Sequence, residues 1–158
     1  MNHPCATRRR YLRDKGFGYL QNSVWITPNP LAEERQILGG GKINVESLIL
    51  LEARPCAGES DGEIVAGAWD FECINRRYAR HLKVPEERPG GTLRNAAAAT
   101  ALLSWAAAER ETWLDAVTND SLLPGRILPS DYLGQQAWRR RVEVLRDASR
   151  QLRTFNRA

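Results

Sequence analysis

The chain lacks any apolar run long enough to cross a membrane. Its 158 residues contain no stretch close to the roughly 18 apolar residues that a transmembrane helix needs. The N-terminal residues Met1–Cys5 also lack the apolar core of a secretory signal. We therefore expect a cytoplasmic protein without a membrane partner.

Cysteine and histidine are both scarce. The three cysteines, Cys5, Cys56 and Cys73, are odd in number and far apart, so they do not suggest a disulfide framework in a reducing compartment. No Cys-x-x-Cys pair indicates a metal site. Of the two histidines, His3 lies in the terminal segment, and we expect His81 to be exposed to solvent near the end of a helix. The sequence predicts neither a metal site nor a cofactor.

Recognisable catalytic motifs are absent as well. Residues Gly39–Lys42 (GGGK) resemble the end of a phosphate-binding loop, but such a loop runs from a strand into a helix and here the predicted order is reversed. The acidic pairs at 33–34 and 86–87 are adjacent in sequence, and neighbouring helix positions diverge by about 100°. The sequence therefore predicts no catalytic residue and a protein that is not an enzyme.

Lysine is nearly absent, although the chain is basic. Only three of the 23 basic residues are lysines, and the net charge is +4. Arginine forms bidentate pairs with phosphate, whereas lysine acts as a point charge. The candidates for contacts with nucleic-acid phosphates are Arg8, Arg9, Arg10, Arg139 and Arg140. A solvated surface explains the same bias equally well.

The first third of the chain contains an aromatic and β-branched segment, residues 16–28, which predicts an extended strand or a tight hairpin. A short basic helix is expected before it at 7–15, with Gly16 as its left-handed stop. A helix at 31–38 and a strand at 44–54 follow, and the strand's nearly continuous apolar run is typical of a strand covered on both faces. This order predicts a ferredoxin-like unit without its first strand. A substitute strand or a partner chain must then cover the unpaired edge.

The rest of the chain is predicted to be helical. Residues 60–63 (Ser-x-x-Glu) form a capping-box pattern, and helical periodicity continues, with a break, over 64–82. An alanine-rich helix is expected at 93–117. A last helix is expected to be capped by Ser130 or Asp131. Its apolar stripe consists of Trp138, Val142, Leu145, Ala148 and Leu152.

Together these elements predict an α+β fold of two domains. Residues 1–57 are expected to form the truncated ferredoxin-like unit, and residues 58–158 a mainly helical C-terminal domain. Trp25 and Trp69 flank turns near this boundary, so they are the better candidates among the five tryptophans for stacking on a ligand. Packing in the core is the alternative role for both.

Three spaced segments carry more specific patterns: FGYLQNSVWITP at 17–28, AGAWD at 66–70 with NRRY at 75–78, and LLPGRILPSD at 122–131. In this order they resemble the PaaX-type repressors, which control operons for phenylacetic acid degradation. The first resembles that family's central domain, the second its A-x-A-W-D…RY segment, and the third its C-terminal L-P-x-x-L-L-P-x-D signature. Tyr132-Leu133 stands where the family has Trp-Pro.

The resemblance implies a regulator of three parts: an N-terminal winged helix that reads DNA, a ferredoxin-like central domain similar in fold to the small CRISPR adaptation nuclease, and a helical C-terminal domain. Members of the family are dimeric repressors that an aryl-CoA thioester, typically phenylacetyl-CoA, releases from DNA. The sequence has no counterpart of the winged helix or of the first central strand. We therefore expect this chain to contact DNA only weakly or through a partner.

Three functions follow as hypotheses. The first is a PaaX-like transcriptional regulator that lacks its winged helix and contributes dimerisation and aryl-CoA binding, with Trp25, Trp69, Arg76 and Arg77 as the effector-binding candidates. The second is a stand-alone interaction module that modulates full-length relatives, which makes a heterodimer an alternative to a homodimer. The third, a metal-dependent nuclease, is disfavoured because the sequence shows no convergent acidic set.

Overall fold

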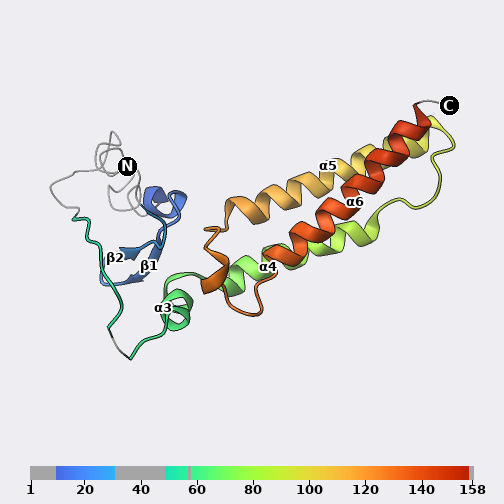
Figure 1. Cartoon of the computed structure of the whole chain (residues 1–158). Helices are drawn as coiled ribbons and strands as arrows, with labels where there is room; N and C mark the ends of the chain where they lie inside the picture. Colours follow the sequence, from blue (N-terminus) through green and yellow to red (C-terminus); the bar gives the residue numbers. More distant parts are fainter. Residues whose placement is uncertain (1–9, 31–48, 57, 157–158) are drawn as a thin grey trace, which may run out of the picture. The chain divides into compact units, whose positions relative to one another are not determined.

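A computed structural model describes residues 10–30, 49–56 and 58–156 of the chain. The chain divides into two packed units (Figure 1). The first combines residues up to Asp70 with 121–129, and the second combines residues 71–120 with those from Ser130 onward. A two-stranded sheet in the first unit and long helices in the second confirm the predicted α+β class. The predicted domain boundary after residue 57 stays a prediction.

The first described helix ends in a Schellman motif. Residues 10–14 are helical, and Gly16 follows in the left-handed region with a φ of +82°. The Gly16 N–H donates to the Arg13 carbonyl at 2.9 Å, and the Phe17 N–H donates to the Leu12 carbonyl at 3.0 Å. These two bonds define the motif, and the apolar contact between Leu12 and Phe17 accompanies it. The predicted helix and its Gly16 stop are confirmed over these residues.

The aromatic segment forms a tight hairpin. Strand β1 (Gly18–Gln21) pairs antiparallel with β2 (Val24–Ile26). The two turn residues, Asn22 and Ser23, have φ values of 47° and 68°. A positive φ at both positions matches the twist of a two-residue hairpin, and asparagine tolerates this region better than most residues. Of the two predicted alternatives, strand or hairpin, the structure contains the hairpin.

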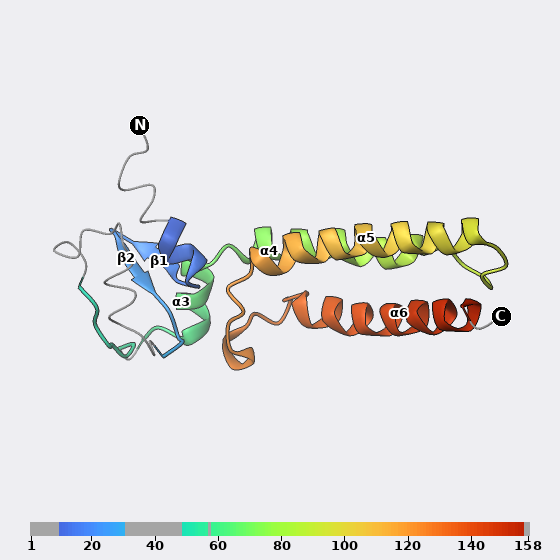
Figure 2. The same cartoon turned by 90° about the horizontal axis from the view of Figure 1, so that it is seen from above.

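Helix α3 (Asp61–Ala68) packs against strand β1 of the hairpin (Figure 2). Its start is the predicted capping box: Glu63 Oε2 accepts from the Ser60 N–H at 2.8 Å, and Ser60 Oγ accepts from the Glu63 N–H at 3.3 Å. The bond from the Ser60 backbone, and then that from its hydroxyl, lower the pKa of Glu63 because both favour the carboxylate. After the helix, the Trp69 ring lies so close to Gly18 that an added Cβ atom would come within 2.6 Å of it.

The predicted second strand is wrong over residues 49–54. These residues form no strand, and Ile49 and Leu51 are 80% and 85% exposed. A strand needs a paired neighbour, and within the described ranges β1 and β2 pair only with each other. The run is therefore apolar but uncovered. Several predicted features lie outside the described residues: 7–9 of the first helix, the helix at 31–38, the turn at 39–42 and the strand residues 44–48.

The second unit consists of three long helices that lie lengthwise against one another (Figures 1 and 2). Its elements are α4 (Phe71–Lys83), the 3-10 turn η2 (Val84–Glu87), α5 (Ala96–Thr118) and α6 (Gly134–Phe155); the 3-10 turn η3 (Gly125–Ile127) belongs to the first unit. The helical predictions for 64–82, with its break, and for 93–117 are confirmed. Among the described residues, no helix has the length and apolar character of a membrane span.

Helix α6 begins later than predicted, and neither Ser130 nor Asp131 caps it. The N-cap residue is Leu133, which has no side-chain cap. The side chain of Asn75 on α4 bonds the start of α6 instead. Its Oδ1 accepts from the Leu133 N–H at 2.9 Å, and its Nδ2 donates to the Asp131 carbonyl at 3.1 Å. The prediction was wrong because the bonding partner lies 58 positions away in sequence, beyond the reach of any local pattern.

The buried face of α6 also differs from the predicted stripe. Trp138 is 51% exposed, whereas Leu145 and Leu152 pack beside the core as predicted. The buried residues of the described helix are Gly134, Ala137, Val144 and Ala148. Small side chains thus face the neighbouring helices, and the large indole stays at the edge.

Two apolar clusters hold the three helices together. One contains Ile74, Tyr78, Ala116 and Ala137. The other contains Leu102, Trp105, Val144 and Ala148. The Trp105 Nε1–H donates to the Val84 carbonyl at 2.8 Å, so the polar atom of this indole is paired. On α5 and α6, one polar position, Glu109 and Arg141 respectively, lies between the residues of the two clusters.

Gly18→Ala should destabilise the first unit. The added methyl group would overlap the Trp69 ring, and inserting a methyl group into filled space costs about 1–3 kcal/mol. Equilibrium unfolding in urea, followed by tryptophan fluorescence, measures the loss.

Gly67→Ala is the matched control within the same unit. This glycine lies inside α3, where an added Cβ atom would come no closer than 3.8 Å to Leu20. Alanine in a helix interior is more stable than glycine by about 0.5–1 kcal/mol. Equal losses of stability in the two variants would contradict the packing of Trp69 on Gly18.

Candidate functional site

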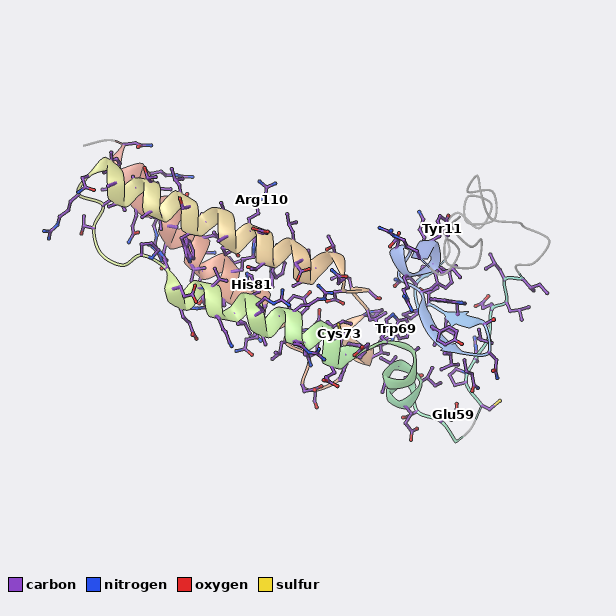
Figure 3. All side chains as sticks on the ribbon, turned by 180° about the vertical axis from the view of Figure 1, so that it is seen from behind. Tyr11, Glu59, Trp69, Cys73, His81 and Arg110 are labelled. Carbon is purple, nitrogen blue, oxygen red and sulfur yellow. The ribbon has the colours of Figure 1, made fainter. Side chains whose placement is uncertain are left out.

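A polar layer crosses the middle of the helical unit. Helix α4 contributes His81, α5 contributes Glu109 and α6 contributes Arg141. His81 and Glu109 are both 0% exposed, and Figure 3 shows His81 inside the unit, whereas Arg110 of α5 points away from it. The prediction that His81 is exposed is therefore wrong. The signal that could have found it is its spacing, because it continues the apolar face of Ile74 and Tyr78 on α4.

One carboxylate oxygen connects the three residues of this layer. Glu109 Oε1 lies 2.9 Å from His81 Nε2 and 2.9 Å from Arg141 Nε. An ionised carboxylate has no hydrogen to donate, so His81 Nε2 donates to it. The contact with Arg141 is an ion pair whose N–H does not point at the oxygen. Glu109 Oε2 and His81 Nδ1 are buried without a hydrogen-bond partner among the described residues.

Aromatic rings enclose the layer on one side. The Trp113 ring lies 5.3 Å from the His81 ring, edge to face, and the Arg141 guanidinium lies 5.1 Å from its centroid. Trp138 packs beside Trp113 at 5.7 Å. Rings in these arrangements attract each other and the cation through their quadrupoles. The charge of Arg141 is thus balanced by a carboxylate and a ring, both within the protein.

A second polar group lies at one end of the same unit. Asp120 Oδ2 accepts hydrogen bonds from the Tyr78 hydroxyl at 2.7 Å and from the Tyr132 hydroxyl at 2.5 Å. Burial first, and then the bond to Asp120, raise the pKa of Tyr78 and of Tyr132 well above the usual range. Both phenols therefore stay protonated and donate to the carboxylate. Within the described residues, no group of three acidic, histidine or cysteine side chains could hold a metal ion.

The tryptophan candidates for effector binding both lie in the first unit. Trp25 is half-buried on β2, with the Tyr19 ring at 5.2 Å and the Arg13 guanidinium at 5.9 Å from its ring centroid. Trp69 is only 8% exposed and packs on Gly18. Of the two indoles, Trp25 is the one with a ring surface that a ligand could reach.

The arginine candidates for effector binding are neighbours on α4, in the second unit. Arg76 is exposed and pairs with Glu72 at 2.9 Å. Arg77 donates to Asp115 of α5 at 2.6 Å and is less exposed. Exposed pairs of the first kind contribute little stability, so Arg76 is the more available of the two for a ligand.

The candidates for phosphate contacts are divided between the two units. Arg8 and Arg9 lie outside the described residues. Arg10 is exposed on the first helix. On α6, Arg139 is exposed and has no acidic partner in the part of the chain that the structure describes, whereas Arg140 lies 3.5 Å from Glu143.

Comparison with known proteins bears on the first unit. Residues 7–65 match the family model described as the PaaX protein central Cas2-like domain. This match covers less than half of the chain, and it makes the first unit similar to the central domain of the PaaX-type family. Members of this family are oligomeric transcriptional regulators. The PaaX match includes the hairpin and the first part of α3, and α4–α6 lie beyond it. No curated protein and no solved structure matches the chain.

Glu109→Ala should destabilise the helical unit by about 3–5 kcal/mol, the usual effect of removing one partner from a buried ion pair. The reason is that Arg141 and His81 would lose the carboxylate that they share. Thermal or urea unfolding followed by circular dichroism measures the change.

Glu111→Ala is the control, because Glu111 lies on the exposed side of the same helix and surface substitutions change stability by less than about 0.5 kcal/mol. The triple variant H81L/E109L/R141M should recover most of the loss, since apolar residues can replace a buried ionic group. A loss in Glu109→Ala no larger than in Glu111→Ala would refute the role of the polar layer.

Proposed function

We propose that this chain acts as a PaaX-like transcriptional regulator through binding: it dimerises and takes an aryl-CoA effector. The family match over residues 7–65 is the observation that carries the proposal. The helical unit supports a binding role, because two of its acidic side chains, one buried and one partly buried, are engaged by neighbouring side chains. Glu109 contacts an imidazole and a guanidinium, and Asp120 accepts from two phenols.

The uncovered apolar run supports dimerisation. Ile49 and Leu51 lie within the PaaX match, and more than three quarters of each residue is exposed. Among the described residues of the same unit, both strands of the hairpin are edge strands. Edge strands and apolar runs of this kind are sites where another chain can add a strand. The proposed partner is a second copy of this chain or a full-length relative that carries the same central domain.

The double variant Ile49→Asp with Leu51→Asp should weaken self-association. Two charges would remain unpaired if the run were covered by a partner, and burial of an unpaired charge is strongly unfavourable. Sedimentation equilibrium or light scattering over a range of protein concentrations measures the shift from dimer toward monomer.

The control carries Glu52→Gln and Arg54→Gln in the same exposed run and should associate like the parent chain. Circular dichroism checks that both double variants are folded. An unchanged dimer fraction in the aspartate variant would contradict this interface, and co-purification with a full-length relative but no self-association would favour the heterodimer.

We propose two separate contacts for the effector, Trp25 in the first unit for an aryl group and Arg76 in the second unit for a phosphate. The exposed part of the half-buried Trp25 side chain suits an aryl group, and the Arg13 guanidinium adds a cation 5.9 Å from its ring centroid. Arg76 suits a CoA phosphate because it is exposed and held only by a surface pair. Trp69 and Arg77, the other two candidates, are engaged by Gly18 and Asp115, so they are assigned supporting roles.

Trp25→Ala should weaken the binding of phenylacetyl-CoA about tenfold or more, since stacking of a flat ring on an aromatic side chain contributes about 1–3 kcal/mol. Trp25→Phe, which keeps a ring at this position, should retain most of the affinity. Isothermal titration calorimetry, with CoA alone as a second probe, measures both variants.

Arg76→Gln should weaken phenylacetyl-CoA and CoA to the same degree, because the phosphates are common to both. Arg94→Gln, an exposed arginine outside the helices, is its control. No heat from phenylacetyl-CoA with the folded parent chain would overturn the effector proposal and leave the dimer proposal standing.

A further inference from the structure

The structure divides the arginines of α6 into two groups. Arg140 pairs with Glu143, Arg141 with the buried Glu109, and Arg150 with Asp147. Arg139, Arg146 and Arg153 are all exposed, and none has an acidic partner within the described ranges. Arg139 makes one long hydrogen bond, at 3.4 Å, to the Gln135 carbonyl of its own helix. Three guanidinium groups are thus left without a counter-charge.

These three arginines form a straight row. They recur every seven residues, and at 3.6 residues per turn each step returns to the same side of the helix within about 20°. At a rise of about 1.5 Å per residue the steps are about 10.5 Å, so the row is about 21 Å long. The buried residues Ala137, Val144 and Ala148 lie on the opposite side, about 140–180° away. The row therefore occupies the outermost line of α6.

A row of this length fits an extended polyanion better than a small anion. We propose that Arg139, Arg146 and Arg153 bind the phosphate backbone of nucleic acid. About 21 Å corresponds to about six base pairs of duplex, at about 3.4 Å for each step of a strand. Guanidinium groups pair with phosphate oxygens in bidentate geometry, and contacts of this kind position a protein without reading sequence.

Trp138 distinguishes between duplex and single-stranded nucleic acid. Its ring is 51% exposed and is held by Trp113 at 5.7 Å. Trp138 lies about 60–100° around the helix from the three arginines, on the flank between the row and the packed side of α6. An exposed ring beside a cationic row is the arrangement that stacks on unpaired bases, whereas a duplex offers no free base face. The inference extends the proposed regulator function, and its test is separate from effector binding and dimerisation.

The test compares the full parent chain with the triple variant R139Q/R146Q/R153Q. Fluorescence anisotropy of a labelled 20-nucleotide strand, and of the same sequence as duplex, measures affinity from 50 to 200 mM salt. Each phosphate contact that is lost should lower the slope of log affinity against log salt by about 0.9 for duplex and about 0.7 for single strand. Trp138→Ala should weaken only the single strand.

The matched control, R80Q/R94Q/R110Q, removes the same charge from exposed residues elsewhere in the helical unit and should keep most of the parent's affinity and salt slope. Equal losses of nucleic-acid affinity in the two triple variants would show that binding depends on net charge alone. That result would contradict the proposed role of the arginine row. Absence of binding to either nucleic acid by the folded parent would also overturn it. Unchanged heats with phenylacetyl-CoA would separate this outcome from failure of the effector proposal.

Discussion

The shared contact of Glu109 with His81 and Arg141 is the interaction on which the helical unit depends. Two apolar clusters alone would hold three helices together in more than one register, because small side chains such as Ala116, Ala137 and Ala148 specify little about sliding or rotation. A buried carboxylate cannot be left without its cation. The polar layer therefore penalises every register in which α4, α5 and α6 do not meet at these three positions.

This constraint also determines which side of α6 faces solvent. Arg141 must point inward to reach Glu109, and Arg139, two positions earlier, then lies about 200° around the helix. Arg146 and Arg153 follow Arg139 to the outside. The Glu109–Arg141 ion pair thus fixes the rotation of α6 about its axis. As a result, Arg139, Arg146 and Arg153 lie together on the solvent-facing side of the helix. The same rotation leaves Trp138 at the edge, half exposed, instead of in the core where its place in the apolar pattern predicts it.

Predictions from the sequence were correct where the cause is local. The Gly16 stop and the Ser60–Glu63 capping box depend on residues within one turn of each other, so the pattern contains the whole interaction. Predictions were wrong where the partner is distant. His81 is buried because Glu109 lies 28 positions later, and residues 49–54 form no strand, since strands require a paired neighbour that no local pattern reveals. For the same reason the sequence could name candidate arginines on α6 but could not separate paired from unpaired ones.

The packing unit that contains the PaaX match is larger than the matched segment itself. The hairpin needs the Trp69 ring on Gly18, and Trp69 lies beyond the end of the match at residue 65. The segment 121–129 returns to the same unit and buries Leu123, which is 6% exposed. Because its two parts are separated by α4 and α5, the first unit cannot be cut from the chain at residue 65 without losing part of its core. The proposed effector binding and dimerisation are therefore to be measured on the full chain, which contains the segment 121–129.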